Sequence, residues 1–482
     1  MTLCRRGPAE FRWYLFLPAF LILPNLPLLL AAHPLNLLLH GTIDLDYLLI
    51  GLLSLFVPRL VTFFLLLAAI VLDFIHAACV TYLFSPAEFM NTMRYGGLLS
   101  TTRIGLIVAA FVAALLVCLA CVACTSPHLR GRQRRLASAT MLVSFLLLAL
   151  ADFGSARDIL LHPGDESNAA RLSRTPTLGL LYSQVIYQRY ERGLRLEGMY
   201  AMPSASALAL NHLEDYRASP PAQQPNVVLV VVESWGLARD LSLRRAMIEP
   251  YSDPHLLAKY EVLRGTMPFQ GPTTSGEARE LCQTHMGAYV AQGTAAQLQR
   301  CLPLRMRRMG YRTLAVHGFR GAMYDRKDWY PHMGFEDIWF HDQLQAAGVP
   351  DCDGTFKGSC DDAIAAWLGD RLQQPGDAPL FVHWVTLNSH LPLWRPVQLK
   401  SPSSCEVSAI TRSDPAVCSW YQLISVVSRS MRDLALKPLG RPTIFVIVGD
   451  HAPPFDKDFE RAQFSSTEVP YVILLPRTEA VR

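Results

Sequence analysis

Long runs of Leu, Val, Ala and Phe dominate residues 1–156, whereas residues 157–482 alternate short apolar runs with polar segments. Five apolar stretches in the first part are long enough, or nearly so, to cross a bilayer as helices. They lie at 13–32, 46–58, 60–84, 103–124 and 137–153. Pro58 and Arg59 separate the second stretch from the third, because proline interrupts a helix and arginine avoids the bilayer centre. We therefore expect a transmembrane domain of five helices at residues 1–156.

Arginine placement predicts the orientation of these helices. Arg5 and Arg6 precede the first stretch, and a cluster at 130–135 lies between the fourth and the fifth. Basic loops stay on the cytoplasmic side of a membrane. Five crossings place both groups in the cytoplasm and the rest of the chain on the opposite side. The pattern thus predicts a multi-pass membrane protein with its C-terminal domain outside the cytoplasm.

A different pattern governs the second part. The stretch "NVVLVVVES" (226–234) is continuously apolar and rich in valine, which is typical of a strand buried on both faces of a parallel sheet. Similar runs follow at 312–318, 379–388, 442–450 and 469–476, with helical patterns between them. This alternation predicts an α/β domain with a mainly parallel central sheet at 223–482. Residues 157–222, ending in a proline-rich stretch, are expected to be a juxtamembrane connector.

Charge and cysteine content indicate which partners and which cellular compartment the second part of the chain suits. The 482 residues carry a net charge of +4. Residues 1–156 contain ten arginines and six acidic residues, so this part of the chain accounts for the whole net charge. A neutral second part argues against nucleic acid as a partner, since phosphate binding needs a basic face. Six of the eleven cysteines lie in the second part as three neighbouring pairs. Such pairs suit disulfides in an oxidising compartment such as the periplasm, with buried free thiols as the alternative.

Candidate chemistry follows the predicted strands, because ligands of such sheets bind at the carboxyl ends of the strands. The first strand ends in Glu233, the second in His317, the third leads to His390, and the fourth ends in Asp450 and His451. Two carboxylates and an imidazole from Glu233, Asp450 and His451 form a plausible ligand set for one divalent cation, Zn²⁺ or Mn²⁺.

The stretch "GPTTSGE" (271–277) places three hydroxyls, Thr273, Thr274 and Ser275, at the start of a predicted helix. Singly, such a hydroxyl is more often a helix cap than a nucleophile. Beside a metal and a helix N-terminus, however, a hydroxyl becomes a plausible nucleophile, and the same place favours an anionic phosphate. The joint occurrence of hydroxyls and ligands at separate strand ends therefore favours a catalytic site.

The order of six motifs resembles the membrane-bound transferases of the alkaline phosphatase and sulfatase superfamily. These motifs are "NVVLVVVESWG", "GPTTSGE", "VHGFRGAMYDRKDWYPHMGFED", "TLNSHLP", "VGDHAPPF" and "VPYVILLP", between 226 and 476. The pattern is most similar to lipoteichoic acid synthase and the phosphoglycerol transferases of periplasmic glucans. This resemblance implies an alkaline phosphatase/sulfatase-like fold behind a five-helix membrane domain.

The resemblance also implies roles for individual residues. The two carboxylates and the imidazole named above correspond to metal ligands. His317, Tyr324 and Arg326 stand at the family spacing for residues that grip the phosphate and headgroup of the donor, although a tyrosine replaces the expected tryptophan. His390 corresponds to the histidine that contacts the transferring phosphate or protonates the leaving group.

The nucleophile is implied by its register. Helices of the family carry an acidic residue four positions after the nucleophile, and Glu277 lies four after Thr273. Thr273 is therefore the predicted nucleophile and metal ligand, with Thr274 as the alternative. Ser275 ranks third, because it lies four before Arg279 as in sulfatases. Those enzymes need a proline where Glu277 stands, which disfavours a genuine sulfatase.

Paired cysteines resemble those of the phosphoethanolamine transferases of Gram-negative envelopes. The implied disulfides are Cys282–Cys301, Cys352–Cys360 and Cys405–Cys418. The chain thus combines features of two branches, and the headgroup is open between phosphoethanolamine and glycerol phosphate.

Taken together, the resemblance implies a metal-dependent phosphotransferase that moves a phospholipid headgroup, through a phospho-threonine intermediate, to a glycan or glycolipid of the cell envelope. Expected partners are the phospholipid donor, the acceptor and envelope polysaccharide synthesis machinery. One alternative is a membrane-bound phosphodiesterase, phosphatase or sulfatase-like hydrolase that uses water as the acceptor. A second alternative is a non-catalytic membrane scaffold.

Overall fold

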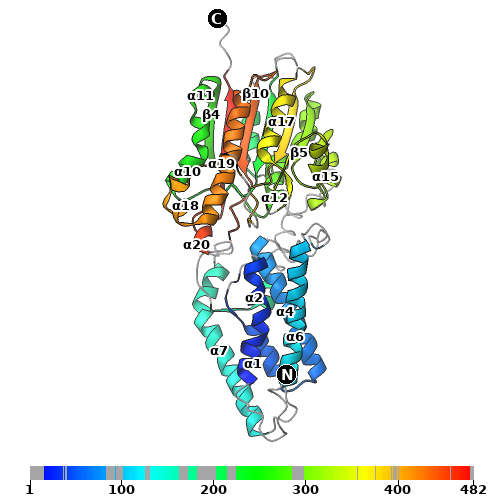
Figure 1. Cartoon of the computed structure of the whole chain (residues 1–482), viewed down its shortest axis with the longest axis vertical. Helices are drawn as coiled ribbons and strands as arrows, with labels where there is room; N and C mark the ends of the chain where they lie inside the picture. Colours follow the sequence, from blue (N-terminus) through cyan, green and yellow to red (C-terminus); the bar gives the residue numbers. More distant parts are fainter. Residues whose placement is uncertain are drawn as a thin grey trace. The chain divides into compact units, whose positions relative to one another are not determined.

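A computed structural model of the chain forms two compact units, Met1–Tyr190 and Glu191–Arg482. Apart from a few isolated positions, the structure describes twelve stretches. They are 16–35, 41–82, 101–124, 131–161, 172–181, 202–213, 224–284, 298–354, 356–374, 376–391, 401–455 and 458–477. Figure 1 traces the elements of both units.

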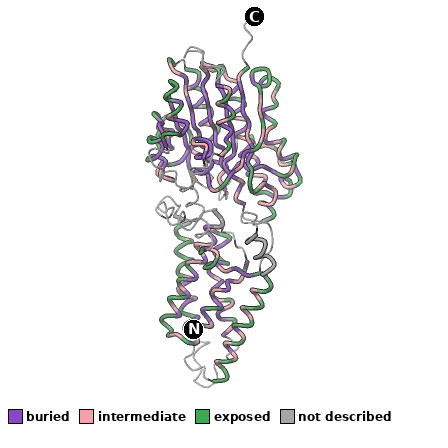
Figure 2. Tube along the Cα trace, turned by 180° about the vertical axis from the view of Figure 1, so that it is seen from behind, coloured by how far each residue is buried: buried purple, intermediate pink, exposed green. Residues whose placement is uncertain are grey.

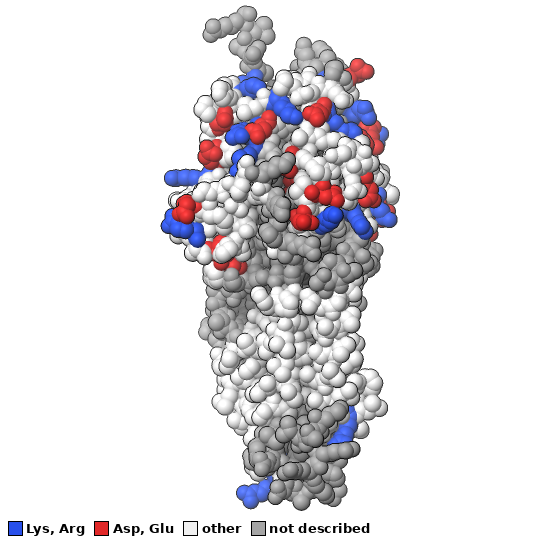
Figure 3. Space-filling model, viewed as in Figure 1, with Lys and Arg blue, Asp and Glu red and all other residues white. Residues whose placement is uncertain are grey.

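The first unit is a helical bundle. Its helices are α1 (Phe16–Leu21), α2 (Leu26–Leu35), α3 (Leu45–Ser54), α4 (Arg59–Tyr82), α6 (Thr101–Cys124) and α7 (Arg132–Leu161), with a short 3-10 turn, η2 (Leu23–Asn25), joining α1 to α2. Phe16–Leu35, Arg59–Cys79, Ile104–Ala123 and Arg132–Ala151 are long and apolar enough to cross a membrane. The face seen in Figure 3 shows almost no charged side chain along the described part of this bundle. An apolar surface of this kind fits a lipid environment.

The described helices thus include four of spanning length, where the sequence predicted five. The predicted stretch at 46–58 forms α3, a helix of ten residues. A helix of this length covers roughly 15 Å, about half of the hydrocarbon core. Its length was overestimated because the apolar run continues past Ser54 into the turn that leads to Pro58.

Despite its shortness, α3 carries the chain along the bundle in the direction opposite to α7. Before α3, strand β1 (Ile43–Asp44) pairs in parallel with β2 (Ser173–Arg174), which follows α7 in the chain. After α3, the ring of Phe56 lies 4.3 Å from the guanidinium of Arg134, near the start of α7. The predicted orientation of the helices across a membrane stays a prediction.

A buried polar cluster ties β2 to the helices of this unit. Arg174 donates from Nε and Nη2 to the two carboxylate oxygens of Asp73 on α4, at 2.8 and 2.6 Å. Its Nη1 and Nη2 also donate to the Gly41 carbonyl and to Asn25 Oδ1. The Tyr47 hydroxyl donates to Asp73 as well, at 3.0 Å. An acidic residue in an apolar helix is thus paired with an arginine from the segment after α7.

A seven-stranded sheet forms the centre of the second unit. Its order is β4 (Tyr260–Pro268), β11 (Glu468–Pro476), β10 (Thr443–Gly449), β3 (Asn226–Val232), β9 (Leu380–Val385), β5 (Arg312–His317) and β6 (Asp337–Trp339). Strands β10, β3, β9, β5 and β6 run in parallel, and β11 is antiparallel to both of its neighbours. The predicted α/β domain with a mainly parallel sheet is confirmed.

Helices cover both faces of this sheet, so the central strands are buried on both sides. Figure 2 shows these strands as continuously buried segments. Along β3, Val228 and Val230 belong to one apolar core while Val227 and Leu229 belong to the other. Two buried faces explain why the strand reads as an unbroken valine run rather than an alternating one.

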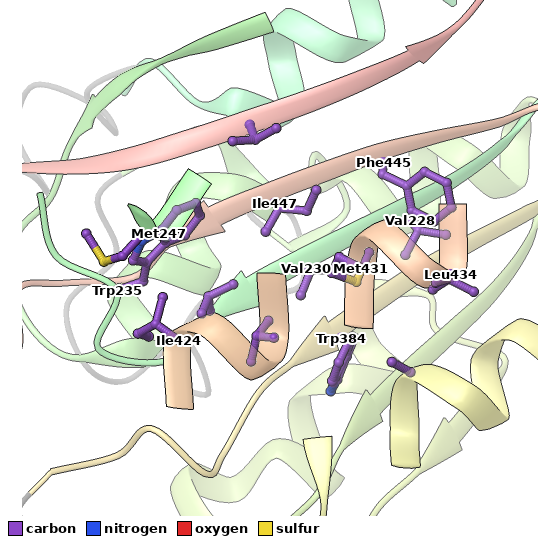
Figure 4. Packing of buried hydrophobic residues seen from close by; sticks show 14 of the residues in the cluster. Val228, Val230, Trp235, Met247, Trp384, Ile424, Met431, Leu434, Phe445 and Ile447 are labelled. Carbon is purple, nitrogen blue, oxygen red and sulfur yellow. The ribbon is translucent and has the colours of Figure 1, made fainter. Parts of the chain in front are cut away.

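The first core lies under α10 (Leu241–Ile248), α17 (Asp361–Gln373) and α19 (Pro415–Leu436). In Figure 4, Ile424, Met431 and Leu434 of α19 lie over Phe445 and Ile447 of β10 and over neighbouring valines of β3. The second core lies under α9 (Ala205–Asn211), α12 (Thr273–Cys282), α14 (Leu302–Arg308) and α15 (Arg326–Met333). Helix α9 falls within the predicted connector, yet its Ala205 and Ala209 are part of this core.

Shorter elements complete the second unit. They are η6 (Glu249–Ser252), α11 (Pro254–Lys259), η8 (Met323–Asp325), α16 (His341–Ala346), β7 (Asp351–Cys352), β8 (Gly358–Ser359), η9 (Cys405–Val407), α18 (Ala409–Ser413) and α20 (Asp458–Arg461). Three disulfides join Cys282 to Cys301, Cys352 to Cys360 and Cys405 to Cys418, with Cα atoms 4.1, 4.9 and 5.5 Å apart. These are the three pairs that the sequence resemblance implied.

Candidate active site

Two neighbouring parallel strands bring two carboxylates and one imidazole together. Val232 at the end of β3 pairs with Gly449 at the end of β10, so the residues that follow both strands meet at one sheet edge. Ligand atoms of Glu233, Asp450 and His451 lie within 4.8 Å of one another. All three side chains are buried.

The hydroxyl of Thr273 joins this cluster. Thr273 is the first residue of α12, and Pro272 before it makes no side-chain cap. Thr273 Oγ1 donates to Glu233 Oε2 at 2.9 Å and lies 3.5 Å from His451 Nε2. Glycine at position 276 allows this approach, because a Cβ atom there would lie only 2.9 Å from Asp450 Cβ. The start of α12 therefore packs directly against the residues that follow β3 and β10.

The other two hydroxyls of the stretch are placed differently. Thr274 is fully buried at 0% exposure, against 5% for Thr273. Ser275 Oγ has no hydrogen-bond partner within the described stretches. The Thr273 hydroxyl contacts both Glu233 and His451.

The donor atoms of this cluster fit a divalent cation. Nδ1 of His451 donates to the Ala452 carbonyl at 2.9 Å, so the lone pair of Nε2 is left for a ligand. His451 Nε2 lies 3.3 Å from Asp450 Oδ2 and 3.5 Å from Thr273 Oγ1. Ligands of a tetrahedral zinc ion stand roughly 3.3–3.6 Å apart, given Zn–ligand distances of about 2.0–2.2 Å. The set matches that spacing.

A buried carboxylate oxygen points to the same conclusion. Asp450 Oδ2 is buried without a hydrogen-bond donor in the described part of the chain. Burial and the nearby Glu233 carboxylate raise the pKa of Asp450 to about 7. Burial alone would lower the pKa of His451, but the Asp450 and Glu233 carboxylates outweigh it and raise that pKa. Two buried carboxylates facing each other are stabilised by a cation between them.

The chain is similar to a protein-family model and to several solved structures. The model described as Sulfatase matches residues 225–482, which is more than half of the chain. The chain belongs to the sulfatase family. The superfamily resemblance predicted from the motifs is thereby confirmed. A search of curated protein sequences found no match.

Three solved structures are among those similar to this sulfatase-family chain. Lipoteichoic acid synthase LtaP from Listeria monocytogenes is 13% identical, with a TM-score of 0.37 over 56% of this chain and 72% of that one. Phosphoglycerol transferase GacH from Streptococcus pyogenes, in complex with sn-glycerol-1-phosphate, is 15% identical, with a TM-score of 0.38 over 57% and 77%. The periplasmic domain of EptC from Escherichia coli, in complex with Zn, is 12% identical, with a TM-score of 0.32 over 54% and 74%.

A second polar group of the sulfatase-family domain centres on Glu277, one turn after Thr273 on α12. Glu277 Oε1 accepts from Arg326 Nε at 2.9 Å and from Nη2 at 2.5 Å. Its Oε2 accepts from the Tyr330 hydroxyl at 2.6 Å, and His383 Nε2 lies at 3.3 Å. Burial would raise the pKa of Glu277, but Arg326 and His383 outweigh it and lower the pKa to about 2.

His317, at the end of β5, lies beside this group. Its Nδ1 donates to the Val385 carbonyl at 3.0 Å, and Nε2 lies 3.5 Å from Arg326 Nη1. Because a carbonyl only accepts, Nδ1 carries the proton, and in the neutral ring Nε2 is an acceptor. Burial and the Arg326 cation lower the pKa of His317 to about 3. The ring is therefore neutral at physiological pH.

Tyr324 stands at the edge of the same group. The guanidinium of Arg326 lies 5.4 Å from the centroid of the Tyr324 ring, within range of a cation–π contact. Tyr324 and Asp325 have φ angles of 55° and 54°, in the left-handed region that few non-glycine residues adopt. Backbone strain of this kind clusters at ligand-binding and catalytic sites.

His390 comes from the loop after β9. Both backbone N–H groups of Leu387 and Asn388 donate to the Asp361 carboxylate, and the Ser389 hydroxyl donates to the Glu233 carbonyl at 2.6 Å. Burial would raise the pKa of Glu233, but His390, His451 and the hydrogen bonds from Ser234 and Thr273 outweigh it and lower that pKa. The ring of Phe356, from the Cys352–Cys360 loop, packs edge to face on His390 at 4.8 Å.

The structure thus brings the predicted residues into two adjoining groups. Thr273 touches the ligand cluster, whereas Arg326 and His317 touch each other and are tied to α12 through Glu277. The sequence analysis used Glu277 as a register marker and did not foresee its pairing with Arg326. It also missed four supporting residues, Ser234, Tyr330, Asp361 and His383. Of these, Ser234 alone has a sequence signal, since it follows Glu233 directly.

Proposed function

We propose that this sulfatase-family protein is a metal-dependent phosphotransferase that moves a phospholipid headgroup, phosphoethanolamine or glycerol phosphate, to a hydroxyl of an envelope glycan or glycolipid. The observation that carries the proposal is the contact of the Thr273 hydroxyl with Glu233 and His451 at the start of α12. A nucleophile, a cation ligand set and the positive end of a helix dipole coincide there.

In this proposal Thr273 reacts as an alkoxide with the phosphorus of the lipid phosphodiester. A cation held by Glu233, Asp450 and His451 would stabilise that alkoxide and the charge on the phosphate oxygens. A Thr273 Oγ1–phosphorus bond forms, the bond from phosphorus to diacylglycerol breaks, and the leaving oxygen takes a proton from His390. In the second half an acceptor hydroxyl gives its proton to His390 and attacks phosphorus, the Oγ1–phosphorus bond breaks, and Thr273 leaves as the alkoxide with which the cycle began.

Headgroup binding is assigned to His317, Tyr324 and Arg326. Glu277 accepts from Nε and Nη2 of Arg326, and Nη1 lies 3.5 Å from His317 Nε2, so the second N–H of Nη1 is assigned to the donor phosphate. His317 Nε2, as an acceptor, can receive a hydrogen bond from an ammonium or hydroxyl group. Both proposed headgroups carry such a donor.

The membrane unit suits a lipid donor. Four apolar helices of spanning length favour residence in the bacterial inner membrane, and three disulfides favour a periplasmic catalytic domain. We propose residues 1–156 as the membrane domain, 157–222 as a connector and 223–482 as the catalytic domain. Envelope polysaccharide machinery would supply the acceptor.

The test is mass spectrometry of the trapped intermediate. Full-length protein in lipid nanodiscs would be incubated with phosphatidylethanolamine or phosphatidylglycerol and with Zn²⁺ or Mn²⁺. We expect a headgroup-phosphate adduct on Thr273 that is lost in Thr273→Ala and kept in Thr274→Ala. An adduct on Thr274 in Thr273→Ala would reassign the nucleophile.

The same preparation separates the rival functions. Release of headgroup phosphate to water at the full rate without an acceptor would identify a hydrolase. Absence of any adduct or turnover, with cellular activity unchanged in Thr273→Ala and Glu233→Ala, would identify a scaffold. Acceleration by an added glycan or glycolipid would support the transferase.

A further inference from the structure

Ser234 lies in the turn after β3, directly after the proposed ligand Glu233, and has an unusual backbone conformation. Its φ angle is 57°, in the left-handed region, and the residue is fully buried. Glycine adopts this conformation freely, whereas a serine is strained in it. A strained residue directly beside Glu233 therefore needs an explanation in terms of what its side chain and backbone contact.

Both hydrogen-bond donors of Ser234 are directed at proposed metal ligands. Its hydroxyl donates to Glu233 Oε1 at 2.8 Å, and its backbone N–H donates to Asp450 Oδ1 at 2.7 Å. Its carbonyl accepts from Trp420 Nε1 at 2.9 Å, which anchors the residue to α19. One residue thus links the carboxylates that follow β3 and β10.

These contacts leave one oxygen on each carboxylate for a ligand. Glu233 Oε2 is the oxygen that faces Thr273 Oγ1. Asp450 Oδ2 is the oxygen 3.3 Å from His451 Nε2, and it has no donor within the described residues. The N–H of His451 also donates to Asp450 Oδ1, at 2.6 Å, so that oxygen is doubly held. Asp450 Oδ2 is thus held beside His451 Nε2, and Glu233 Oε2 beside Thr273 Oγ1.

We propose that Ser234 is a positioning residue that fixes the rotation of the Glu233 and Asp450 carboxylates for a divalent cation. This inference rests on the proposed metal-dependent function and adds a residue to it. The left-handed backbone aims the N–H at one carboxylate while the hydroxyl reaches the other. Outer contacts of this kind typically change metal affinity 10–100-fold when removed.

The test compares Ser234→Gly with Ser234→Ala. Both remove the hydroxyl, but glycine is unstrained at this φ angle whereas alanine is strained. Chelator-treated full-length protein in detergent would be titrated calorimetrically with ZnCl₂ and with MnCl₂. We expect both variants to bind the cation about 10–100-fold more weakly than the parent protein. Ser425→Ala is the control. It removes a buried serine hydroxyl that lies on α19, and this variant should bind the cation as the parent does.

Thermal unfolding without metal distinguishes positioning from folding. Ser234→Gly should unfold at or above the parent temperature and still lose affinity, which a purely structural role would not produce. Affinity of Ser234→Gly within threefold of the parent would overturn the inference while leaving the proposed function intact. A parent protein that binds neither cation would overturn both.

Discussion

Arg326 donates from Nε and Nη2 to a single oxygen of Glu277, and both side chains are almost completely buried. Glu277 lies one helical turn after Thr273, so the residue that orients Arg326 and the proposed nucleophile share one helix. Loss of one member of such a pair leaves a buried charge uncompensated.

Glu277→Gln should therefore destabilise the catalytic unit. We expect a loss of about 3 kcal/mol, because the Arg326 guanidinium stays buried without its counter-charge. Thermal unfolding of the purified protein measures the effect. Glu406→Gln is the matched control, since Glu406 pairs with Arg412 at the surface and should cost less than about 1 kcal/mol. Equal shifts for the two variants would contradict the prediction.

Acid should weaken the fold through His317. Its pKa is about 3 in the folded chain, below the ordinary value of 6.5, so between these pH values the unfolded state binds more protons. Stability contributed by neutral His317 is present above pH 6.5 and is lost as the pH falls toward 3. From pH 7 to pH 4.5 the parent should lose about 2–3 kcal/mol more than His317→Gln, as measured by denaturant unfolding. Parallel pH profiles for the two proteins would argue against a neutral buried ring.

Arg174 should be needed for the folded membrane unit. Arg174→Ala leaves the Asp73 carboxylate buried without its bidentate partner, at a cost of about 3–5 kcal/mol. The double variant Asp73→Asn with Arg174→Gln removes both charges and should recover part of this loss. Fractions of monomeric protein after heating in detergent would report both effects. A double variant less stable than Arg174→Ala would be inconsistent with an ion pair.

Cys282 closes α12 through its disulfide to Cys301, 19 positions later. Replacing both cysteines by serine should lower stability by about 3 kcal/mol, because the unfolded chain regains the entropy of the open loop. The same exchange at Cys352 and Cys360, which are 8 positions apart, should cost about 0.5–1 kcal/mol less. Unfolding under non-reducing conditions would rank the two variants, and the reverse order would exclude loop length as the cause.

Sequence patterns predicted the central strands because β3, β9, β5 and β10 are buried on both faces. They did not predict β4, an edge strand whose side chains are mostly partly exposed, or β6, which has three residues. Helix α9 was missed because its seven residues follow a segment without a clear period. Burial, rather than strand propensity, produced the readable signal.

The candidate site was predictable where chemistry follows a strand end. Glu233, Asp450 and His451 lie together because parallel neighbouring strands end at one edge. Supporting contacts were not predictable in this way. Arg326 reaches Glu277 across 49 positions of sequence, and Ser234 reaches Asp450 across 216. Such pairs depend on the folded arrangement of several elements, which no local pattern encodes.

Helix α12 carries Thr273 and Glu277 four positions apart, so a single turn of helix separates the proposed nucleophile from the carboxylate that binds Arg326. The rise between them is about 6 Å, since each residue advances a helix by about 1.5 Å. A helical turn cannot lengthen without breaking its hydrogen bonds. Under the proposed function, we expect this fixed spacing to favour headgroups of two or three carbon atoms over bulkier ring-containing ones.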